Sequence, residues 1–408
     1  MSLWILVACG VILTALLNPV RGAEQSSVEE IAKAINAFGV NLYREFGSEP
    51  ANIVVSPFSI HTALAMSYAG ARGATAREMA GVLQFTEAAR DIHAGYRVLL
   101  KGTTERSRSG CEIVVANSLF AQSGYLFLKP FQELLRDNYD GSTYEVDLTG
   151  SPGFDPVKAA AARKQINNWI ADKTRGKISQ ILPSTFPDPD TRLMLVNAVW
   201  FKGKWATQFQ KAATADAPFY LATEGFVTVP MMNLKANFAY ADWDDVQILQ
   251  VPYTGEHFSM VFCLPKNSRE LAAIEKSLSF RKIEKWSQSI KLRKVMVSLP
   301  RFRLVSELEL NAPLGRLGLK QSFSDSADFS GITPEKPFYI KAALHKAYVD
   351  VDEEGTEAAA STVIIFDESS VADNPIIFNA NHPFLFLIRD NHTGLILFIG
   401  RVADPSKE

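Results

Sequence analysis

The chain has 408 residues, of which 47% are hydrophobic and 21% are charged, and its formal net charge is −2. This composition excludes a disordered or fibrous chain, and the near-neutral charge disfavours a nucleic-acid-binding protein. No linker rich in Pro, Gly or Ser and no internal repeat interrupts the sequence, so we predict one large domain over residues 23–408.

The first residues have the pattern of a secretory signal peptide. Leu3–Leu17 is an almost unbroken apolar run, followed by Asn18-Pro19 and by the small pair Gly22-Ala23. The run is too short for a comfortable membrane span and has the length and flanks of a signal-peptide core, although no Lys or Arg precedes it. We therefore predict a signal peptide at residues 1–22 and a secreted, extracellular protein that does not associate with a membrane.

The first half of the chain is predicted to be mainly helical. Apolar residues at helical spacing predict an amphipathic helix over residues 26–48, and residues 52–60 predict a short strand broken by Pro57. Gly70 and Gly176 are stop signals for two later helices, and Thr103–Ser109 is the most loop-like internal segment. The further helices are expected up to Ala69 and over residues 74–83, 87–100, 130–139 and 162–174, with strands at 111–121 and 142–148.

After Gly176 the pattern changes to runs rich in Val, Ile, Phe and Tyr, which favour strands. Helices gather early and strands late, without a strict β-α-β alternation. The predicted fold class is therefore α+β, with large and mainly antiparallel or mixed sheets. The strand-like runs are residues 192–201, 226–234, 247–252, 258–264, 294–303, 338–351 and 376–402.

Two cysteines and one sequon bear on the secreted chain. Cys111 and Cys263 remain after the signal peptide, each in an apolar run, and we expect two free buried thiols because a core this large does not depend on a disulfide. A single disulfide between them is the alternative. Asn391-His392-Thr393 is an N-x-S/T sequon, so Asn391 is predicted to be a glycosylation site on a turn.

Several basic residues follow one another at roughly helical spacing after residue 87. The simpler interpretation is a solvated helix face, and the alternative is a surface that binds a polyanion such as a glycosaminoglycan. The residues concerned are Arg90, Arg97, Lys101, Arg106 and Arg108.

The motifs of common enzyme classes are absent from the sequence. There is no G-x-S-x-G, H-E-x-x-H, C-x-x-C or G-x-x-x-x-G-K-[ST] pattern, and the six histidines show no metal-ligand spacing. We expect no enzymatic activity, no metal and no cofactor.

The segment 350–378 breaks the strand pattern with a run of small residues. With a period of two, one face of an extended chain carries Thr356, Ala358, Ala360 and Thr362, all small and uncharged. Such a face could enter the middle of a sheet without burying a charge. The segment is also polar enough to stay exposed as a loop, and a short Ala-rich helix is the local alternative.

Several motifs resemble the serpin family. EEGTEAAAST at residues 353–362 is similar to the hinge of inhibitory serpins, and FNANHPFLFLI at 378–388 is similar to their C-terminal signature. NIVVSPFSI, INNWIADKTRGKISQIL, LMLVNAVWFKGKW, DFSGIT and HKAYVDVDEEGTEAA occur in the family's usual order over nearly the whole mature chain.

The resemblance implies a fold of three β-sheets and about nine helices, with an exposed reactive-centre loop at about residues 353–378. A protease cuts the loop and forms an acyl-enzyme, and the cleaved loop then inserts into the central sheet and distorts the trapped protease. Gly355 and the small residues Thr356, Ala358 and Ala360 would form the hinge, with no charge or proline on the inward face. This favours an inhibitor over a non-inhibitory carrier or binding serpin, and the family implies a monomer.

The resemblance also assigns residues below and at the top of the central sheet. Ser56, Ser59, Asn197 and His345 are similar to the hydrogen-bonded cluster beneath its central strands, and Trp205 is similar to the aromatic residue where the loop first enters. Taken alone, each of these residues favours the simpler interpretation as an ordinary helix cap, turn or core residue, and only their joint occurrence in the expected contexts favours the cluster.

The cleaved bond is expected about fourteen residues after the hinge glycine, which places it at Ser369–Ser370. Serine suits the narrow pocket of elastase-like proteases, and no Lys or Arg between Lys346 and Arg389 would attract a trypsin-like one. A shift in register to Asp367 or Glu368 would favour a protease that prefers acidic residues, including a cysteine protease. Phe366 would favour a chymotrypsin-like enzyme.

Overall fold

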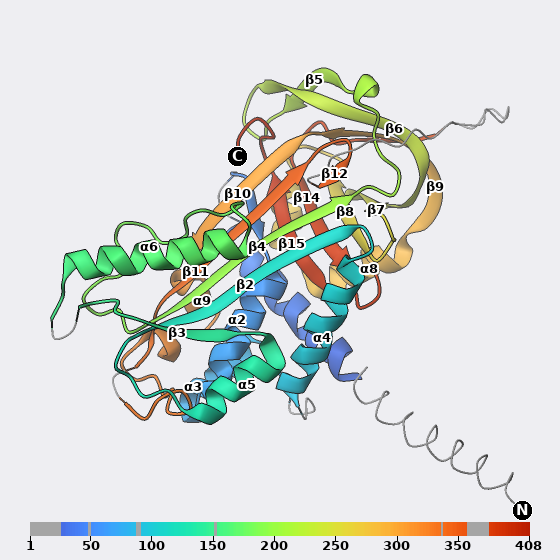
Figure 1. Ribbon diagram of the computed structural model, residues 1–408. Helices are drawn as coiled ribbons and strands as arrows, with labels where there is room; N and C mark the ends of the chain where they lie inside the picture. The colour runs from blue at the N-terminus through green and yellow to red at the C-terminus, as the bar shows by residue number, and fades with distance from the viewer. Residues whose placement is uncertain (1–25, 48–49, 87–90, 151–152, 336–337, 357–374) are drawn as a thin grey trace, which may run out of the picture.

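The computed structural model describes residues 26–47, 50–86, 91–150, 153–335, 338–356 and 375–408 (Figure 1). The predicted signal peptide, Arg90, the hinge residues Ala358 and Ala360, and residues 366–370 lie outside these ranges. Among the described residues the α+β class predicted from the sequence is confirmed.

The helices lie mostly in the first half of the chain, as expected. A helix covers residues 26–44, four residues shorter than predicted at its C-terminal end. The segment Thr103–Ser107, expected to be a loop, is instead the end of α4. The other helices are α2 (Pro57–Gly70), α3 (Gly73–Val82), α4 (Ile92–Ser107), α5 (Lys129–Tyr139), α6 (Pro156–Lys173), α7 (Leu271–Lys276), α8 (Phe280–Ser289) and α9 (Asn311–Arg316), with 3₁₀ turns at Lys211–Ala213 and Gln321–Phe323.

Pro57 starts a helix rather than interrupting a strand. The strand β1 ends at Val55, Ser56 accepts a hydrogen bond from the backbone N–H of Ser59 as the N-cap of α2, and Pro57 occupies the first helical position. Proline suits that position because its missing N–H would have had no partner within the helix. This cap fixes both serines beneath the central sheet.

A six-stranded sheet forms the centre of the molecule in Figure 1, in the order β10-β11-β12-β4-β2-β3. The long helix α6 lies across its front face, and α2 lies on the opposite side. Its strands are β2 (Cys111–Gln122), β3 (Ser142–Val146), β4 (Leu193–Lys204), β10 (Phe302–Glu309), β11 (Ile340–Val351) and β12 (Gly355–Thr356).

The other two expected sheets are joined into one nine-stranded sheet. The reason is β6, a strand of 17 residues that pairs with β5 near its start, with β9 along its middle and with β7 at its end. The strands of this sheet are β1 (Ile53–Val55), β5 (Ala215–Tyr220), β6 (Phe226–Asp242), β7 (Val246–Pro252), β8 (Phe258–Pro265), β9 (Lys291–Pro300), β13 (Ile376–Asn379), β14 (Phe384–Asp390) and β15 (Ile396–Val402).

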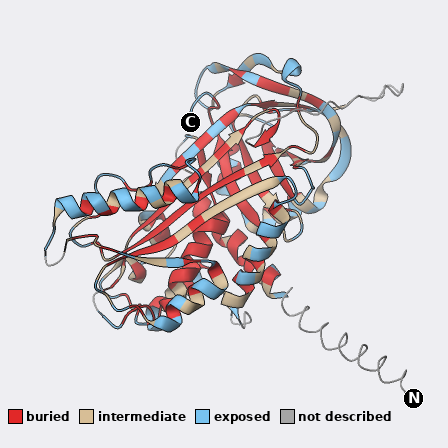
Figure 2. Ribbon diagram, in the orientation of Figure 1, coloured by how far each residue is buried: buried red, intermediate tan, exposed pale blue. Residues whose placement is uncertain are grey.

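Two apolar clusters cover the two faces of the central sheet. Along β4, Met194, Val196 and Ala198 pack in the cluster that includes α6, whereas Leu195 and Val199 belong to the main core. This alternation follows from the period of two along a strand. Figure 2 shows the result, with the strands buried between the layers and the outward faces of α4, α5 and α6 exposed.

Candidate functional site

The central sheet is closed along most of its length and opened at one end. From Ile340 to Tyr348, β11 pairs directly with β4 in parallel. Beyond that point the two strands separate, and the two-residue strand β12 lies between them, antiparallel to both. The sheet therefore already holds the first residues of a further strand.

Gly355 is required where the chain turns back into this gap. Its φ of 153° lies in the region that favours glycine, and a Cβ there would come within 2.0 Å of the carbonyl oxygen of Gly203. Any other residue would push β12 away from β4. The hinge glycine predicted from the sequence thus stands at a position with both a conformational and a steric reason for glycine.

Aromatic residues form the floor of the opening. Thr356 is fully buried, and its hydroxyl lies 2.8 Å from the hydroxyl of Tyr253. Trp205 stacks on Tyr253 with the ring centres 4.6 Å apart, and its indole N–H donates to the carbonyl of Asp352 at 2.9 Å. Trp205 therefore supports the turn that brings the chain into the sheet.

Two acidic residues anchor the same turn. Glu353 is only 1% exposed and accepts hydrogen bonds from Arg301 at 2.5–3.0 Å and from Thr214 at 2.5 Å. Burial alone would raise the pKa of Glu353, but the hydrogen bonds from Arg301 and Thr214 outweigh it and hold the pKa below its usual value. Glu354 pairs with Lys211 at 2.7 Å. The role of these carboxylates was not predicted, because their partners are distant in sequence.

Four predicted residues meet in the middle of the sheet. His345 and Asn197 face each other across β11 and β4, and the His345 ring hydrogen-bonds to the Asn197 side chain. Asn197 in turn donates to Ser59, whose backbone N–H donates to Ser56. The backbone N–H of Ser56 donates to Nε2 of His345 at 3.2 Å, which closes the cluster.

The cluster has a fifth member, Asn117 on β2. It faces Asn197 in the sheet register and accepts hydrogen bonds from Asn197 and, at 3.2 Å, from Ser59. Asn117 is missing from the sequence prediction, although a lone amide within the apolar run 111–121 is a residue that needs buried partners.

These contacts require a neutral His345. Because the Ser56 N–H donates to Nε2, that nitrogen must be the acceptor, so the proton sits on Nδ1 and is donated to Asn197. Burial lowers the pKa of His345 to about 3, which is consistent with the neutral form. A protonated ring would place two donors against each other.

The remaining predicted residues lie away from this site. Asn391 is on the expected turn, but its side-chain N–H₂ donates at 2.8 Å to both Glu256 and Ser259, so a glycan on this nitrogen would displace one of these bonds. Cys111 and Cys263 are free, as expected, although Cys111 is only partly buried.

The basic residues predicted on one helix do not all face solvent. Arg97 and Lys101 are exposed on α4, and Arg108 is exposed just after it. Arg106 instead donates to the buried carboxylate of Asp390 at 2.5 Å. This arrangement removes Arg106 from any surface that could bind a polyanion.

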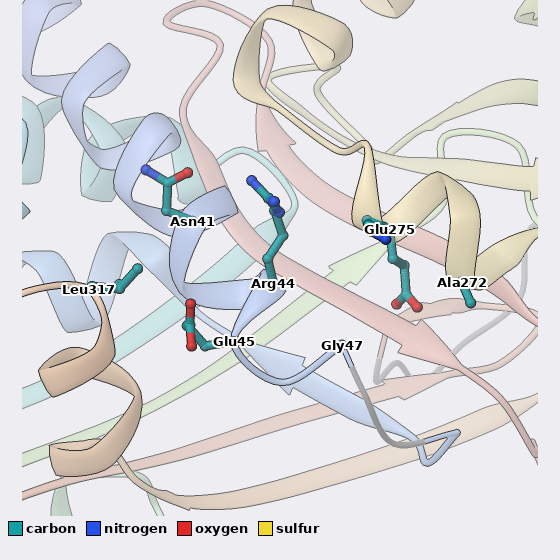
Figure 3. A pocket seen from close by; sticks show the side chains of 8 residues that line it. Asn41, Arg44, Glu45, Gly47, Ala272, Glu275 and Leu317 are labelled. Atoms are coloured by element: carbon teal, nitrogen blue, oxygen red, sulfur yellow. The ribbon is translucent and has the colours of Figure 1, made fainter.

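A cavity of about 440 Å³ lies beside the C-terminal end of the helix 26–44, between that helix and α7 (Figure 3). The carboxylate of Glu275, the buried acid of this cavity, accepts hydrogen bonds from Arg401 at 2.9 Å and from the hydroxyl of Tyr43 at 2.5 Å. Glu45 pairs with Arg316 at 2.6 Å. In Figure 3 the labelled side chains point in different directions, so they do not converge on one ligand position.

Two features of the described residues bear on other functions. Within those ranges no group of three or more His, Cys, Asp or Glu side chains is arranged to hold a metal ion. None of the helices in the described part of the chain is both long and apolar enough to cross a bilayer.

Comparison with known proteins identifies the family. A family model described as "Serpin (serine protease inhibitor)" matches residues 33–405. The chain is 38% identical over 388 residues to the leukocyte elastase inhibitor of Bos taurus and 39% identical over 387 residues to Serpin B8 of Homo sapiens. In each case the match covers 93% of this chain and 100% of the relative. This chain belongs to the serpin family.

A solved structure supports the same assignment at the level of the fold. The crystal structure of Serpin48 from the insect Tenebrio molitor matches this serpin with a TM-score of 0.81 and 30% sequence identity. The match covers 92% of this chain and 98% of the other. The serpin fold predicted from the sequence is therefore confirmed.

Proposed function

We propose that this serpin is a secreted, monomeric inhibitor of serine proteases, and not an enzyme, that traps its target as an acyl-enzyme. The observation that carries the proposal is β12, a two-residue strand held between β11 and β4 at the point where these strands separate. Continuation of β12 into the sheet would convert a parallel pair into two antiparallel pairs. That conversion would satisfy the backbone hydrogen bonds of the inserted segment, which supplies the driving force.

The register of β12 predicts where the following residues would go. Thr356 pairs with Val351 of β11 and with Gly203 of β4. In an antiparallel pair, one step forward along one strand is one step back along its partner, so the residue numbers of facing positions have a constant sum. That sum is 707 for pairing with β11 and 559 for pairing with β4. Thr362 would then face both His345 (707 − 362) and Asn197 (559 − 362), and these two residues are already partners of each other. Both neighbours thus give the same register for insertion.

This register makes the central cluster the barrier to insertion. A strand that reaches Thr362 must break the hydrogen bond between His345 and Asn197. Thr362 carries a hydroxyl that can donate or accept in place of that bond, whereas an apolar residue would leave buried polar groups without partners. The small side chains of residues 358 and 360 would lie on the same face of the inserted strand as the buried Thr356, and there they would pack against the main core.

The proposed target is an elastase-like protease that cuts at Ser369–Ser370. The small Ser369 suits a narrow pocket, and the related proteins of similar length include leukocyte elastase inhibitors. Cleavage there would leave the whole segment from Thr356 to Ser369 on the inserting side. Cleavage after Phe366 would shorten it by three residues.

The test is incubation of the full chain with elastase, chymotrypsin, trypsin and an Asp-cleaving protease. Denaturing gels would report covalent complexes, and mass spectrometry would identify the released C-terminal peptide. We expect a complex that survives SDS with elastase and a peptide that begins at Ser370. Cleavage by all four proteases without any stable complex would contradict the inhibitory function, whereas a stable complex with a different peptide would correct only the bond.

A further inference from the structure

The outer face of the nine-stranded sheet carries most of the exposed apolar side chains. Nine large apolar side chains are exposed in the described part of the chain, and five of them lie on β5, β6, β9 and β13. Figure 2 shows exposed residues along the outer curve of β6 and β9. Soluble monomers rarely gather exposed apolar side chains in this way, so this face is a candidate interaction surface. The five residues are Tyr220, Phe226, Leu292, Met296 and Ile377.

Strand register places three of the five on one face. Met296 of β9 faces Ile377 of β13, and Leu292 lies four residues before Met296 on the same strand. Their exposed fractions are 68% for Leu292, 40% for Met296 and 55% for Ile377. The opposite face of the two strands, with Val295 and Phe378, is buried in the main core. We call Leu292, Met296 and Ile377 the outer patch.

The charge around the outer patch is positive. Lys235 of β6 is exposed and faces Met296 directly, and Lys294 lies on the same face of β9. Among the described residues at facing positions of β6, β9 and β13, none on this face is Asp or Glu. A second copy of this chain would bring like charges together, whereas an acidic partner would be attracted. The other residues on this face are Asn233, Asn237, Ala239, Ser298 and Asn379.

The outer patch lies beside both described ends of the reactive-centre loop. At the C-terminal end, β13 begins at Ile376 and pairs with β9. At the N-terminal end, Glu353 is held by Arg301, the residue that directly follows β9. The loop is therefore attached on both sides to the strand that carries Leu292 and Met296.

A protease that cuts the loop is large enough to reach the outer patch. Ile377 is seven residues after Ser370, and seven residues span at most about 25 Å. A protease domain of about 200 residues has a radius of gyration of about 16 Å and is therefore roughly 40 Å across. Contact between such a protease and β13 or β9 needs no rearrangement of the sheet.

We propose that the outer patch and Lys235 form a second contact surface for the target protease, and that this protease carries an apolar contact region with an acidic rim. The inference rests on the proposed inhibitory function and adds a preference that the loop alone does not provide. Among elastase-like proteases with the same narrow pocket, an anionic one would associate faster than a cationic one. The positive charges would speed the encounter, and the apolar contacts would slow its dissociation.

The test uses the native full chain with inert forms of an anionic and a cationic elastase, in which the nucleophilic serine is replaced by alanine. Because an inert protease cannot cut the loop, surface plasmon resonance measures docking without trapping. We expect Lys235→Glu to slow association with the anionic elastase by about fivefold or more, and the difference should shrink at high salt. The matched control is Lys129→Glu, the same charge change at an exposed position of α5, which lies at the other end of the molecule from β9 in Figure 1.

Met296→Gln tests the apolar part of the surface. Glutamine keeps the length of the side chain but not its apolar character, so dissociation from the anionic elastase should become about threefold faster or more at low and at high salt. Val157→Thr makes a similar change at an exposed apolar residue of α6 and should leave dissociation unchanged.

Several outcomes would overturn this second contact surface. They are absence of docking by both inert elastases, equal association of the two, or the same effect of Lys235→Glu and Lys129→Glu. Vesicles that contain phosphatidylserine provide one more comparison. If Lys235→Glu removes binding to these vesicles and leaves elastase docking unchanged, the surface binds a membrane instead.

Active elastase separates this inference from the proposed function. A stable complex that forms at the same rate in wild type and Lys235→Glu would support inhibition and reject the second contact surface. Docking that depends on Lys235, without any stable complex, would support the surface and reject inhibition.

Discussion

The top and the middle of the central sheet are held together by different physical interactions. At the top, β12 is kept in place by the ion pair of Glu353 with Arg301 and by the stacked Trp205 and Tyr253. In the middle, the closed sheet depends on neutral hydrogen bonds between His345, Asn197 and their partners. The interaction at the top is an ion pair, and one of its partners reaches solvent. The interactions in the middle join neutral groups, and both partners are buried.

This difference follows from the cost of burial. Arg301 is 43% exposed, so its charge remains partly hydrated while it compensates Glu353. Within the described part of the chain burial is the one cause that shifts the pKa of His345, with no contribution from an opposite charge, so a charge there would have to be desolvated without compensation. The stability of the top of the sheet should therefore depend on the charges of its residues. The stability of the middle should depend on its hydrogen-bond partners and should fall in acid.

The largest effect is expected for Thr356→Arg. The arginine would have to be buried where Thr356 is now fully enclosed beside Tyr253, so insertion should fail and the protein should become a substrate. We expect the stable complex to be lost and the stoichiometry of inhibition to rise about tenfold or more, measured by residual protease activity. The matched control is Glu357→Arg, because the period of two along an extended strand predicts that residue 357 faces away from the side on which Thr356 is buried. If Thr356→Arg inhibits as well as Glu357→Arg, the inward-face argument is wrong.

Asn197→Ala should have the largest effect on stability. It leaves the Nδ1–H of the buried His345 without its acceptor and removes the hydrogen bonds that Asn197 donates to Ser59 and Asn117, so the free energy of unfolding should fall by about 3 kcal/mol in urea denaturation. Asn233→Ala, which removes amide contacts at a partly exposed position on β6, should cost about 1 kcal/mol or less. Equal losses in the two variants would contradict a special role for the central cluster.

Glu353→Gln tests the top of the sheet. The neutral amide cannot compensate Arg301, so we expect a loss of about 2 kcal/mol in urea denaturation at neutral pH. Glu307→Gln, in the exposed pair with Lys346, should change stability by about 0.5 kcal/mol or less. Because the pKa of Glu353 is lowered in the folded state, the stabilisation is present at neutral pH and is lost as the pH falls through that pKa. The difference between wild type and Glu353→Gln should therefore shrink in acid.

The last prediction is a dependence of the folding stability on pH that comes from two buried histidines, of which His345 lies in the middle of the central sheet and His61 lies on α2. His345 and His61 are buried, with pKa values lowered to about 3 and about 4, so below their ordinary value of 6.5 the unfolded chain binds protons that the folded chain does not. Stability should fall with the pH by about 1.4 kcal/mol per unit for each histidine.

The slope can be assigned to the central cluster by substitution. Between pH 6 and pH 5, His345→Gln should remove about half of the slope that the two histidines contribute, whereas His392→Gln, at an exposed position, should leave it unchanged. An unaltered slope in His345→Gln would show that the central cluster does not sense acid.

Part of this site could be predicted from the sequence because its residues carry local constraints. Gly355 is needed for a backbone conformation, and the small inward residues after it follow a period of two. Ser56, Ser59, Asn197 and His345 were found through their motifs, but their mutual hydrogen bonds depend on three separate chain segments. Tyr253 and Arg301 have no local signal, because each matters only through a partner far away in the chain, and the only local sign of Asn117 is that it is an amide within an apolar run.

The sequence by itself determined the α+β class and the small, uncharged face after Gly355, because these depend on local composition and periodicity, whereas the hinge was predicted from the resemblance of its motif to that of inhibitory serpins. Only the tertiary structure decided that β12 already occupies the top of the gap between β11 and β4, and that His345 and Asn197 face each other farther along the same two strands. The physical reason is that strand register and burial are set by contacts between distant segments, which no local pattern encodes.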